Sequence, residues 1–277
     1  MEKRKKILVV GLGIIGGSIC RSLMRAGEYV AGYDIDREAA QSALERGYIV
    51  EIGENYEVYD VVFLAVPPTA TIQLLTGSRF RAGALVADVC GVKKAIEEAV
   101  FSKNRNYRYI GLHPMAGRET SGLDSSSPTL FDGANLVITL AKNTEQSALD
   151  EALELAGKMR FGRITKCTAE EHDQKIALTS QLAHIVSNAY VKSPTAARAT
   201  GFTGGSFQDM TRIAGVDETV WSELYLYNRE FLLEELNGLI GNLEAYRTAL
   251  YNNDELSLKK TLQEGKICRK SIKRGRF

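Results

Sequence analysis

The first 165 residues of the chain alternate short apolar runs with segments of helical periodicity. Mostly apolar runs predict strands at 7–10, 29–33, 60–66, 84–88, 109–112 and 135–140. Helical spacing predicts helices at 15–26, 36–46 and 92–102. Strands without a polar face are buried on both sides, which is typical of a parallel sheet covered by helices. The pattern therefore predicts an α/β, doubly wound fold for this part of the chain.

Beyond residue 165 the strand signals nearly disappear and helical patterns take over. Thr168–Glu171 forms a T-x-x-E capping box, which predicts a long helix from there to about Tyr190. Further helices are predicted at 207–214, 218–235, 238–251 and 254–269. No low-complexity linker separates the two halves. We therefore expect two firmly packed domains, 1–165 and 166–277, of which the second is all-helical.

The long helix predicted after residue 168 has an unusual surface. Between Ile176 and Val191 it contains no Asp, Glu, Lys or Arg. Its polar residues recur at helical spacing on one face, and they are Ser180, Gln181, His184, Ser187 and Asn188. Because the other faces are apolar, we predict a buried helix whose polar stripe lines a site or an interface.

Composition narrows the class of protein. Of the 277 residues, 44% are hydrophobic and 25% are charged, as in ordinary soluble globular proteins. The net charge of +1 gives no electrostatic reason to bind nucleic acid or a membrane. The basic residues at 266–276 are typical of a solvated helix end. Because the four cysteines are far apart and only three histidines occur, we expect reduced thiols, no metal site and a cytoplasmic protein.

The apolar run at 7–20 follows several lysines and imitates a signal peptide, but four glycines interrupt it. Three of these glycines form the pattern G-x-G-x-x-G at Gly11, Gly13 and Gly16, directly after a predicted strand and at the start of a helix. In a dinucleotide-binding turn the first glycine permits the tight turn, the second admits the pyrophosphate, and the third lets helix and strand pack closely. A glycine-rich turn without a ligand is the alternative. The pattern predicts a Rossmann-type dinucleotide-binding domain.

The residue at the end of the second predicted strand bears on the choice of cofactor. Asp34 would accept hydrogen bonds from the ribose hydroxyls and repel a 2′-phosphate, so we predict NAD, while Arg37 leaves NADP as an option. Val66 and Pro67 end a strand at the edge where such cofactors lie, although they could equally serve only to end it. The predicted cofactor-binding residues are Gly11, Leu12, Gly13, Ile14, Ile15, Gly16, Asp34, Arg37, Val66 and Pro67.

His113 follows the predicted strand at 109–112 and begins the segment H-P-M-A-G-R-E-T-S-G. This context predicts an exposed sheet edge. Removing a hydride from a carbinol carbon requires a base for the hydroxyl proton, and neutral histidine suits that role near pH 7. A loop histidine with a structural hydrogen bond is the alternative.

The pattern H-P-M-A-G-x-E-x-S-G, placed after a dinucleotide-binding half, resembles the prephenate dehydrogenase family of tyrosine biosynthesis, which includes arogenate dehydrogenases. Three later features also resemble that family: the helix that carries His172-Asp173 and 180–184, the segment Phe207–Ala214, and Trp221 nine residues after Arg212. The resemblance extends over essentially the whole chain.

The resemblance implies a reaction and assigns roles in it. The reaction is the NAD-dependent oxidative decarboxylation of prephenate to 4-hydroxyphenylpyruvate. His113 is expected to hydrogen-bond the ring hydroxyl and assist hydride transfer, and Arg212 to bind a substrate carboxylate. His184, Ser180 and Gly117 are expected to contribute to substrate binding. Without the resemblance, Arg212 could form a surface ion pair and His184 could be a satisfied core residue.

The chain also departs from the family pattern. Gly91 occupies the position of a serine whose hydroxyl often supports the catalytic histidine, and the neighbouring Cys90 could offer only a weak S–H donor. Gln208 and Gln181–Ala183 also differ from the usual residues. We expect a capping or structural role for His172, and a core or interface position for Trp221.

The resemblance leaves the substrate open between prephenate and arogenate. A non-catalytic NAD-binding regulatory protein and an imine or hydroxyacid reductase are further alternatives. The family pairs its helical halves across a two-fold axis, so we expect a homodimer. Apolar residues suited to that interface, or to the core, are Tyr225, Leu226, Phe231, Leu232, Leu233, Leu236, Leu239 and Ile240. Any feedback by tyrosine is expected at the active site, since no regulatory domain fits within 277 residues.

Overall fold

The computed structural model describes residues 4–117 and 120–272. Packing divides the chain into two compact units, Met1–Asn228 and Arg229–Phe277. The boundary predicted near residue 165 lies inside the first unit, where the last strand is followed by a helix, and it stays a prediction about domain organisation. All four cysteines are free thiols. Among the described residues, no helix combines the length and apolar character needed to cross a bilayer.

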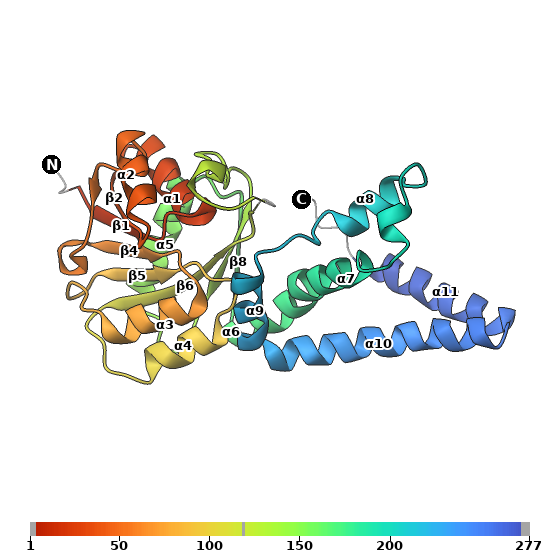
Figure 1. Ribbon diagram of the computed structural model, residues 1–277. Coiled ribbons are helices and arrows are strands. Elements are labelled where there is room, and N and C mark those ends of the chain that lie inside the picture. Colours follow the sequence, from red (N-terminus) through yellow and green to blue (C-terminus); the bar gives the residue numbers. More distant parts are fainter. Residues whose placement is uncertain (1–3, 118–119, 273–277) are drawn as a thin grey trace. The chain divides into compact units, whose positions relative to one another are not determined.

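The first unit contains an eight-stranded sheet in the order β3-β2-β1-β4-β5-β6-β7-β8 (Figure 1). The strands are β1 (Lys6–Val10), β2 (Tyr29–Tyr33), β3 (Glu51–Ile52), β4 (Val61–Leu64), β5 (Leu85–Asp88), β6 (Arg108–Pro114), β7 (Asn135–Thr139) and β8 (Arg163–Cys167). All neighbours are parallel except β6 and β7, which pair antiparallel with His113 opposite Val137. The predicted doubly wound fold is confirmed, with this one reversal of strand direction.

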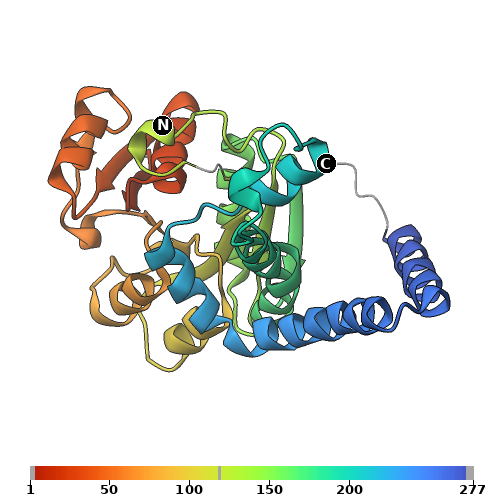
Figure 2. The same ribbon diagram turned by 45° about the vertical axis from the view of Figure 1, so that its right-hand side comes forward.

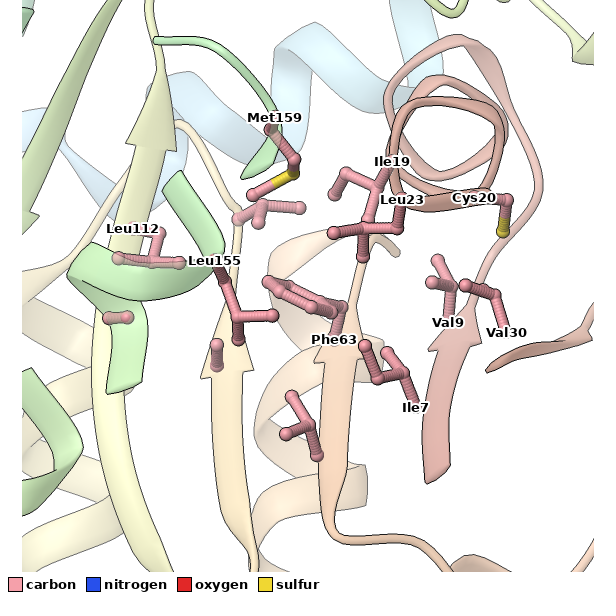
Figure 3. Close-up of a cluster of buried hydrophobic side chains, with 14 of the residues drawn as sticks. Ile7, Val9, Ile19, Cys20, Leu23, Val30, Phe63, Leu112, Leu155 and Met159 are labelled. Atoms are coloured by element: carbon pink, nitrogen blue, oxygen red, sulfur yellow. The ribbon is translucent and has the colours of Figure 1, made fainter. Parts of the chain in front are cut away.

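Helices cover both faces of the sheet. They are α1 (Ile14–Arg25), α2 (Arg37–Glu45), α3 (Pro68–Gly77), α4 (Lys94–Phe101) and α5 (Gln146–Lys158), with short 3₁₀ turns at Tyr56–Val58 and Leu123–Ser125. One core cluster lies between the sheet and α1, α2 and α5, where Phe63 and Leu23 are buried (Figure 3). A second cluster joins the other face to α3 and α4 through Leu75 and Ile96. This two-sided burial explains why β1, β4 and β5 read as uninterrupted apolar runs.

Four elements were not anticipated from the pattern. Helices α3 and α5 were not predicted, and strands β3 and β8 were missed because β3 has two residues and β8 is mostly polar and partly exposed. Helix α3 begins at Pro68, whose missing N–H is tolerated at the first helical position. The two prolines at 67–68 therefore end one element and begin the next.

The helical part of the first unit follows β8. It comprises α6 (Ala169–Ile176), a π-helical segment (Ala177–Leu182), α7 (Ala183–Tyr190), a 3₁₀ turn (Ala196–Arg198), α8 (Gly205–Thr211) and α9 (Glu218–Tyr227). The predicted capping box is present, since the Thr168 hydroxyl accepts the Glu171 N–H at 3.1 Å. The helix predicted over 168–190 is interrupted by the π-helical segment and is not fully buried, since Leu178 is half exposed.

The second unit consists of α10 (Arg229–Tyr251) and α11 (Glu255–Ser271). Helix α11 doubles back from the end of α10 after a short turn in which Asn253 has a positive φ of 52° (Figure 2). The helix predicted over 218–235 is wrong in its extent, because the helical pattern is interrupted at Asn228. Helix α10 begins at the next residue and continues without interruption through the helix predicted at 238–251. Several apolar side chains of α10 and α11 are exposed, and they include Leu233, Ile240, Leu243, Leu250, Leu256 and Leu262.

Candidate active site

The glycine turn between β1 and α1 has the geometry expected of a dinucleotide site. Gly11 has a φ of +88°, and a Cβ there would lie 2.3 Å from the Ala65 carbonyl oxygen. A Cβ at Gly16 would lie 1.7 Å from the Gly11 oxygen, so helix and turn touch backbone to backbone. In contrast, no heavy atom of the described residues outside the local turn lies within 4 Å of a Cβ built at Gly13. The space above Gly13, at the N-terminus of α1, is therefore open to a pyrophosphate.

Asp34 lies at the end of β2 beside this turn. Its carboxylate accepts hydrogen bonds from the backbone N–H groups of Leu12 (2.6 Å) and Asp36 (2.9 Å). It also lines an open cavity of about 620 Å³ together with Arg37 and Glu38. The Arg37 side chain is 90% exposed and lies 3.9 Å from Glu54. The backbone thus holds Asp34 in place, whereas Arg37 is held loosely.

Val66 and Pro67 lie next to the glycine turn. A Cβ at Gly11 would be 2.8 Å from a methyl carbon of Val66. The Val66 carbonyl accepts hydrogen bonds from the Thr71 hydroxyl (3.0 Å) and the Cys90 thiol (3.2 Å). The structure therefore brings the predicted cofactor-binding residues together at one edge of the sheet.

His113 is the second-last residue of β6, and it begins a chain of hydrogen bonds. Its Nδ1 is 2.8 Å from Nε2 of His172, and Nδ1 of His172 is 2.6 Å from Oδ1 of Asp173. The Asp173 carboxylate in turn accepts the backbone N–H groups of Lys93 (2.8 Å) and Lys94 (2.9 Å) at the start of α4. The chain therefore links strand β6, helix α6 and the N-terminus of α4.

Two predictions need correction here. His172 was expected to cap or support its own helix, but it is buried and contacts His113 directly. His113 was expected at an exposed edge, but it is half-buried. The sequence places these histidines 59 positions apart, and only the docking of α6 beside β6 brings them together.

Ionised and polar groups lie buried near His113. Lys93 is fully buried and forms an ion pair with Asp88, which also accepts a hydrogen bond from the Tyr109 hydroxyl at 2.7 Å. Burial, the neighbouring His172 and the Lys93 charge hold the pKa of His113 well below its ordinary value. Burial likewise lowers the pKa of His172, although its hydrogen bond to Asp173 opposes the shift. Both imidazoles are therefore neutral near pH 7.

The glycine that replaces the family serine lies beside the histidine ring. A Cβ built at Gly91 would be 3.9 Å from Nε2 of His113, so the position faces that nitrogen. The adjacent Cys90 thiol donates to the Val66 carbonyl instead, and burial together with the Asp88 charge raises its pKa to about 12. Cys90 therefore does not take over the role of the absent hydroxyl.

His184, on α7, lies against an aromatic residue of α9. Its ring centroid is 3.9 Å from that of Trp221, and its Nδ1 is 2.9 Å from the Ser180 carbonyl. Trp221 also contacts Tyr225 edge-on at 5.6 Å. Trp221 thus packs directly against His184, a candidate substrate-binding residue. The sequence alone did not indicate this contact.

The other residues of the polar stripe bind neighbouring segments to α7 and to the π-helical segment that precedes it. The Ser187 hydroxyl donates to the Met210 carbonyl (2.7 Å), and the Asn188 amide donates to the Ala214 carbonyl (3.1 Å). The buried Gln181 amide donates to the Leu224 carbonyl and accepts from Asn228. These three residues hold the segments around α8 and α9 in place.

Helix α9 is also attached to the cofactor edge of the sheet. Glu223 accepts the backbone N–H of Thr69 in the first turn of α3, and the Tyr227 hydroxyl is 3.0 Å from the Thr69 hydroxyl. Helix α9 therefore contacts α3 through Glu223 and Tyr227, and it contacts His184 of α7 through Trp221.

The two remaining predicted substrate residues lie in exposed segments. Arg212 directly follows α8 and is exposed. Gly117 is exposed and immediately precedes residues 118–119, which lie outside the described part of the chain together with that part of the predicted motif.

An open glycine turn at a helix N-terminus and a neutral, half-buried histidine lie at the same carboxyl edge of the sheet. This combination, with the findings below, defines an NAD-dependent oxidoreductase. The nucleotide-binding domain model of prephenate dehydrogenase matches residues 19–164, and the dimerization domain model matches residues 168–264. The chain belongs to the prephenate dehydrogenase family.

Individual relatives agree with this assignment. A prephenate dehydrogenase from Lactococcus lactis is 30% identical over 97% of this chain and 77% of its own length. The structure of prephenate dehydrogenase from A. aeolicus in complex with hydroxyphenyl propionate and NAD+ matches with a TM-score of 0.83 and 27% identity, over 98% of this chain and 99% of that one. Synechocystis arogenate dehydrogenase matches with a TM-score of 0.77 and 28% identity, over 96% and 99% of the two chains.

Proposed function

We propose that this enzyme catalyses the NAD-dependent oxidative decarboxylation of prephenate to 4-hydroxyphenylpyruvate. The observation that carries the proposal is the position of His113. It lies at the same sheet edge as the glycine turn, with Nδ1 engaged by His172 and Nε2 on the other edge of the ring. The names of the relatives from Lactococcus lactis and Bacillus subtilis point to the same substrate.

The residues present fit the dinucleotide. The open space above Gly13 and the N–H groups at the start of α1 suit a pyrophosphate. The Asp34 carboxylate suits ribose hydroxyls, and Val66 with Pro67 would border the nicotinamide end. NAD supplies an acceptor for hydride when bound.

The side chains then perform the remaining tasks of the reaction. Nε2 of His113 accepts the proton of the ring hydroxyl as the carbinol carbon loses hydride. Carbon dioxide then leaves the opposite ring carbon, its bonding electrons stay in the ring, which becomes aromatic, and the phenolate oxygen takes the proton back from Nε2 of His113. Arg212 is proposed to bind a substrate carboxylate, because guanidinium suits bidentate recognition. His184, Ser180 and Gly117 are proposed to contact the rest of the substrate.

A second candidate substrate is arogenate, which carries an amine in place of the side-chain ketone. The observation in its favour is the similarity to Synechocystis arogenate dehydrogenase over nearly the full length of both chains. The chemistry at the ring is the same for both substrates, so His113 would keep its role.

We also propose that the chain forms a homodimer and works in the cytoplasm. The match to a dimerization domain and the exposed apolar side chains of α10 and α11 support the dimer. The four free thiols support a reducing compartment.

The test follows NADH absorbance with the purified protein, NAD and either prephenate or arogenate. We expect NADH formation with prephenate and its loss in His113→Asn, with unchanged NAD binding as the control. Turnover of arogenate alone would transfer the proposal to the second substrate. NAD binding without turnover of either compound would contradict the proposal and favour a regulatory role.

A further inference from the structure

We propose that His172 and Asp173 are positioning residues that fix the tautomer and the orientation of His113 through its Nδ1, while position 91, beside Nε2, contributes no side chain. This inference rests on the proposed dehydrogenase function and adds two residues to its machinery. It was not expected from the sequence, where His172 was assigned a role in its own helix.

Asp173 is buried, and backbone groups hold its carboxylate. Both of its carboxylate oxygens accept backbone N–H groups at the start of α4, from Lys93 and Lys94. An ionised carboxylate can only accept hydrogen bonds. The group that lies 2.6 Å from its Oδ1, Nδ1 of His172, must therefore donate.

The proton positions on the two imidazole rings follow from this donor. A neutral imidazole carries one proton, so a His172 that is protonated at Nδ1 has a bare Nε2 that can only accept. Nδ1 of His113, 2.8 Å away, must then carry a proton and donate it. The remaining nitrogen of His113, Nε2, is left with its lone pair on the edge that faces Gly91. This is the tautomer that a general base requires.

The protonation states of the two rings agree with this order. Burial lowers the pKa of both histidines, and the Lys93 charge lowers each further, so neither ring is charged near pH 7. A protonated His172 would instead be able to donate from both nitrogens and could force His113 into the opposite tautomer. The buried Lys93 ammonium therefore helps to keep the chain of hydrogen bonds in one direction.

Gly91 contributes no side chain to the ring, and the Cys90 thiol is directed to the Val66 carbonyl. Within the described part of the chain, the hydrogen bond that His113 donates to His172 is the one that orients the His113 ring. When Nε2 accepts the substrate proton, the Nδ1–H bond to His172 is retained and stabilises the imidazolium.

The test compares the wild-type enzyme with His172→Leu and His172→Gln. Leucine removes the acceptor, whereas the glutamine amide can accept from His113 and donate to Asp173. Thr168→Ala is the matched control, because its hydroxyl caps the same helix through the Glu171 N–H and takes no part in the hydrogen-bond chain.

We expect His172→Leu to lower kcat by roughly 10²–10⁴-fold, the range that general acid–base catalysis contributes. KM for the substrate and Kd for NAD should stay near their wild-type values, and His172→Gln should recover part of the loss. Thr168→Ala should lower Tm and leave kcat unchanged. A folded His172→Leu enzyme with wild-type kcat, or an equal loss in both His172 variants, would overturn the proposal.

A second measurement does not depend on turnover. Nitrogen-15 NMR of the imidazole groups reports which nitrogen carries the proton, and the three histidines can be assigned with single variants. We expect the Nδ1–H tautomer for His113 in the wild type and its loss in His172→Leu. An Nε2–H tautomer in the wild type would overturn the inference. The expected tautomer in a protein that turns over neither substrate would refute the proposed function while supporting the inference.

Discussion

At the scale of single residues, the site combines one neutral base with carboxylates that backbone N–H groups hold in place. His113 is paired through its Nδ1, while the carboxylates of Asp34 and Asp173 are held by main-chain N–H groups. Backbone donors at helix starts are rigid, so the side chains they hold lose little further freedom when substrate and cofactor bind. Two predictions follow from individual positions.

The first concerns pH. A general base must be unprotonated, and the pKa of His113 is lowered by burial, by His172 and by the Lys93 charge. The proton that inactivates the base therefore binds only below the ordinary histidine value of about 6.5. We expect the acidic limb of kcat/KM to have its midpoint below that value, measured with a parallel check of folding by circular dichroism. A midpoint clearly above 6.5 would contradict the assignment of His113.

The second contrasts two glycines of the same turn. A side chain at Gly13 meets open space, whereas one at Gly16 meets the Gly11 backbone. We expect Gly13→Val to change the free energy of unfolding by less than about 0.5 kcal/mol, as for surface sites, yet to lower the affinity for NAD. Gly16→Val should lower Tm. Calorimetric titration with NAD and thermal unfolding of both variants measure this, and undiminished NAD binding by Gly13→Val would refute the placement of the pyrophosphate.

At the scale of elements, the site depends on how α6, the π-helical segment and α9 join. Asn228, at the end of α9, is buried and donates to the Asp173 carbonyl (2.9 Å) and to the Gln181 side chain (2.7 Å). Asp173, one member of the His172–Asp173 pair, is thus held by a third element. Such a buried bridge stabilises the arrangement because its loss leaves polar groups unsatisfied.

Asn228→Ala tests this bridge. Leaving buried partners without a hydrogen bond costs about 1–3 kcal/mol, so we expect a decrease of that size in the free energy of unfolding, measured with urea. Asn104→Ala, at an exposed position, is the control and should change it little. An equal effect of the two substitutions would show that the bridge is not formed.

The sequence predicted elements better than it predicted their contacts. Six of the eight strands, the glycine turn and Asp34 followed from local patterns, since each role is fixed within a few neighbouring residues. The contacts of His172 with His113 and of Trp221 with His184 arise only when distant elements pack, so no local spacing could indicate them. The break at Asn228 was missed because its amide is satisfied by residues about 50 positions away.

At the scale of the whole molecule, the chain comprises two compact units, and α10 and α11 of the second expose many large apolar side chains. Surfaces of this kind are typical of interfaces rather than of monomers. Together with the match to a dimerization domain, this supports the proposed homodimer.

The prediction at this scale uses two neighbouring positions of α10. Ile240 is 46% exposed, and Asn242 is exposed two residues later. If the apolar side chains pair two copies of the chain, Ile240→Asp should shift the mass measured by light scattering from dimer towards monomer. Asn242→Asp adds the same charge and should leave the dimer intact. A wild-type protein that is monomeric at micromolar concentration would refute the dimer itself.

The π-helical segment at Ala177–Leu182 makes this stretch of the chain tolerant to a change in length. A π turn accommodates one residue more than an α turn, whereas each residue of an α-helix turns its successors by about 100°. Deleting one residue within the segment would therefore let the wide turn become an α turn and leave α7 in its present orientation. The same deletion within the first turn of α7 has no wide turn to absorb it, so Ser187 and Asn188 would turn away from the Met210 and Ala214 carbonyls. When homologous chains are aligned, a single gap thus preserves these contacts if it falls within Ala177–Leu182 and breaks them if it falls a few residues later.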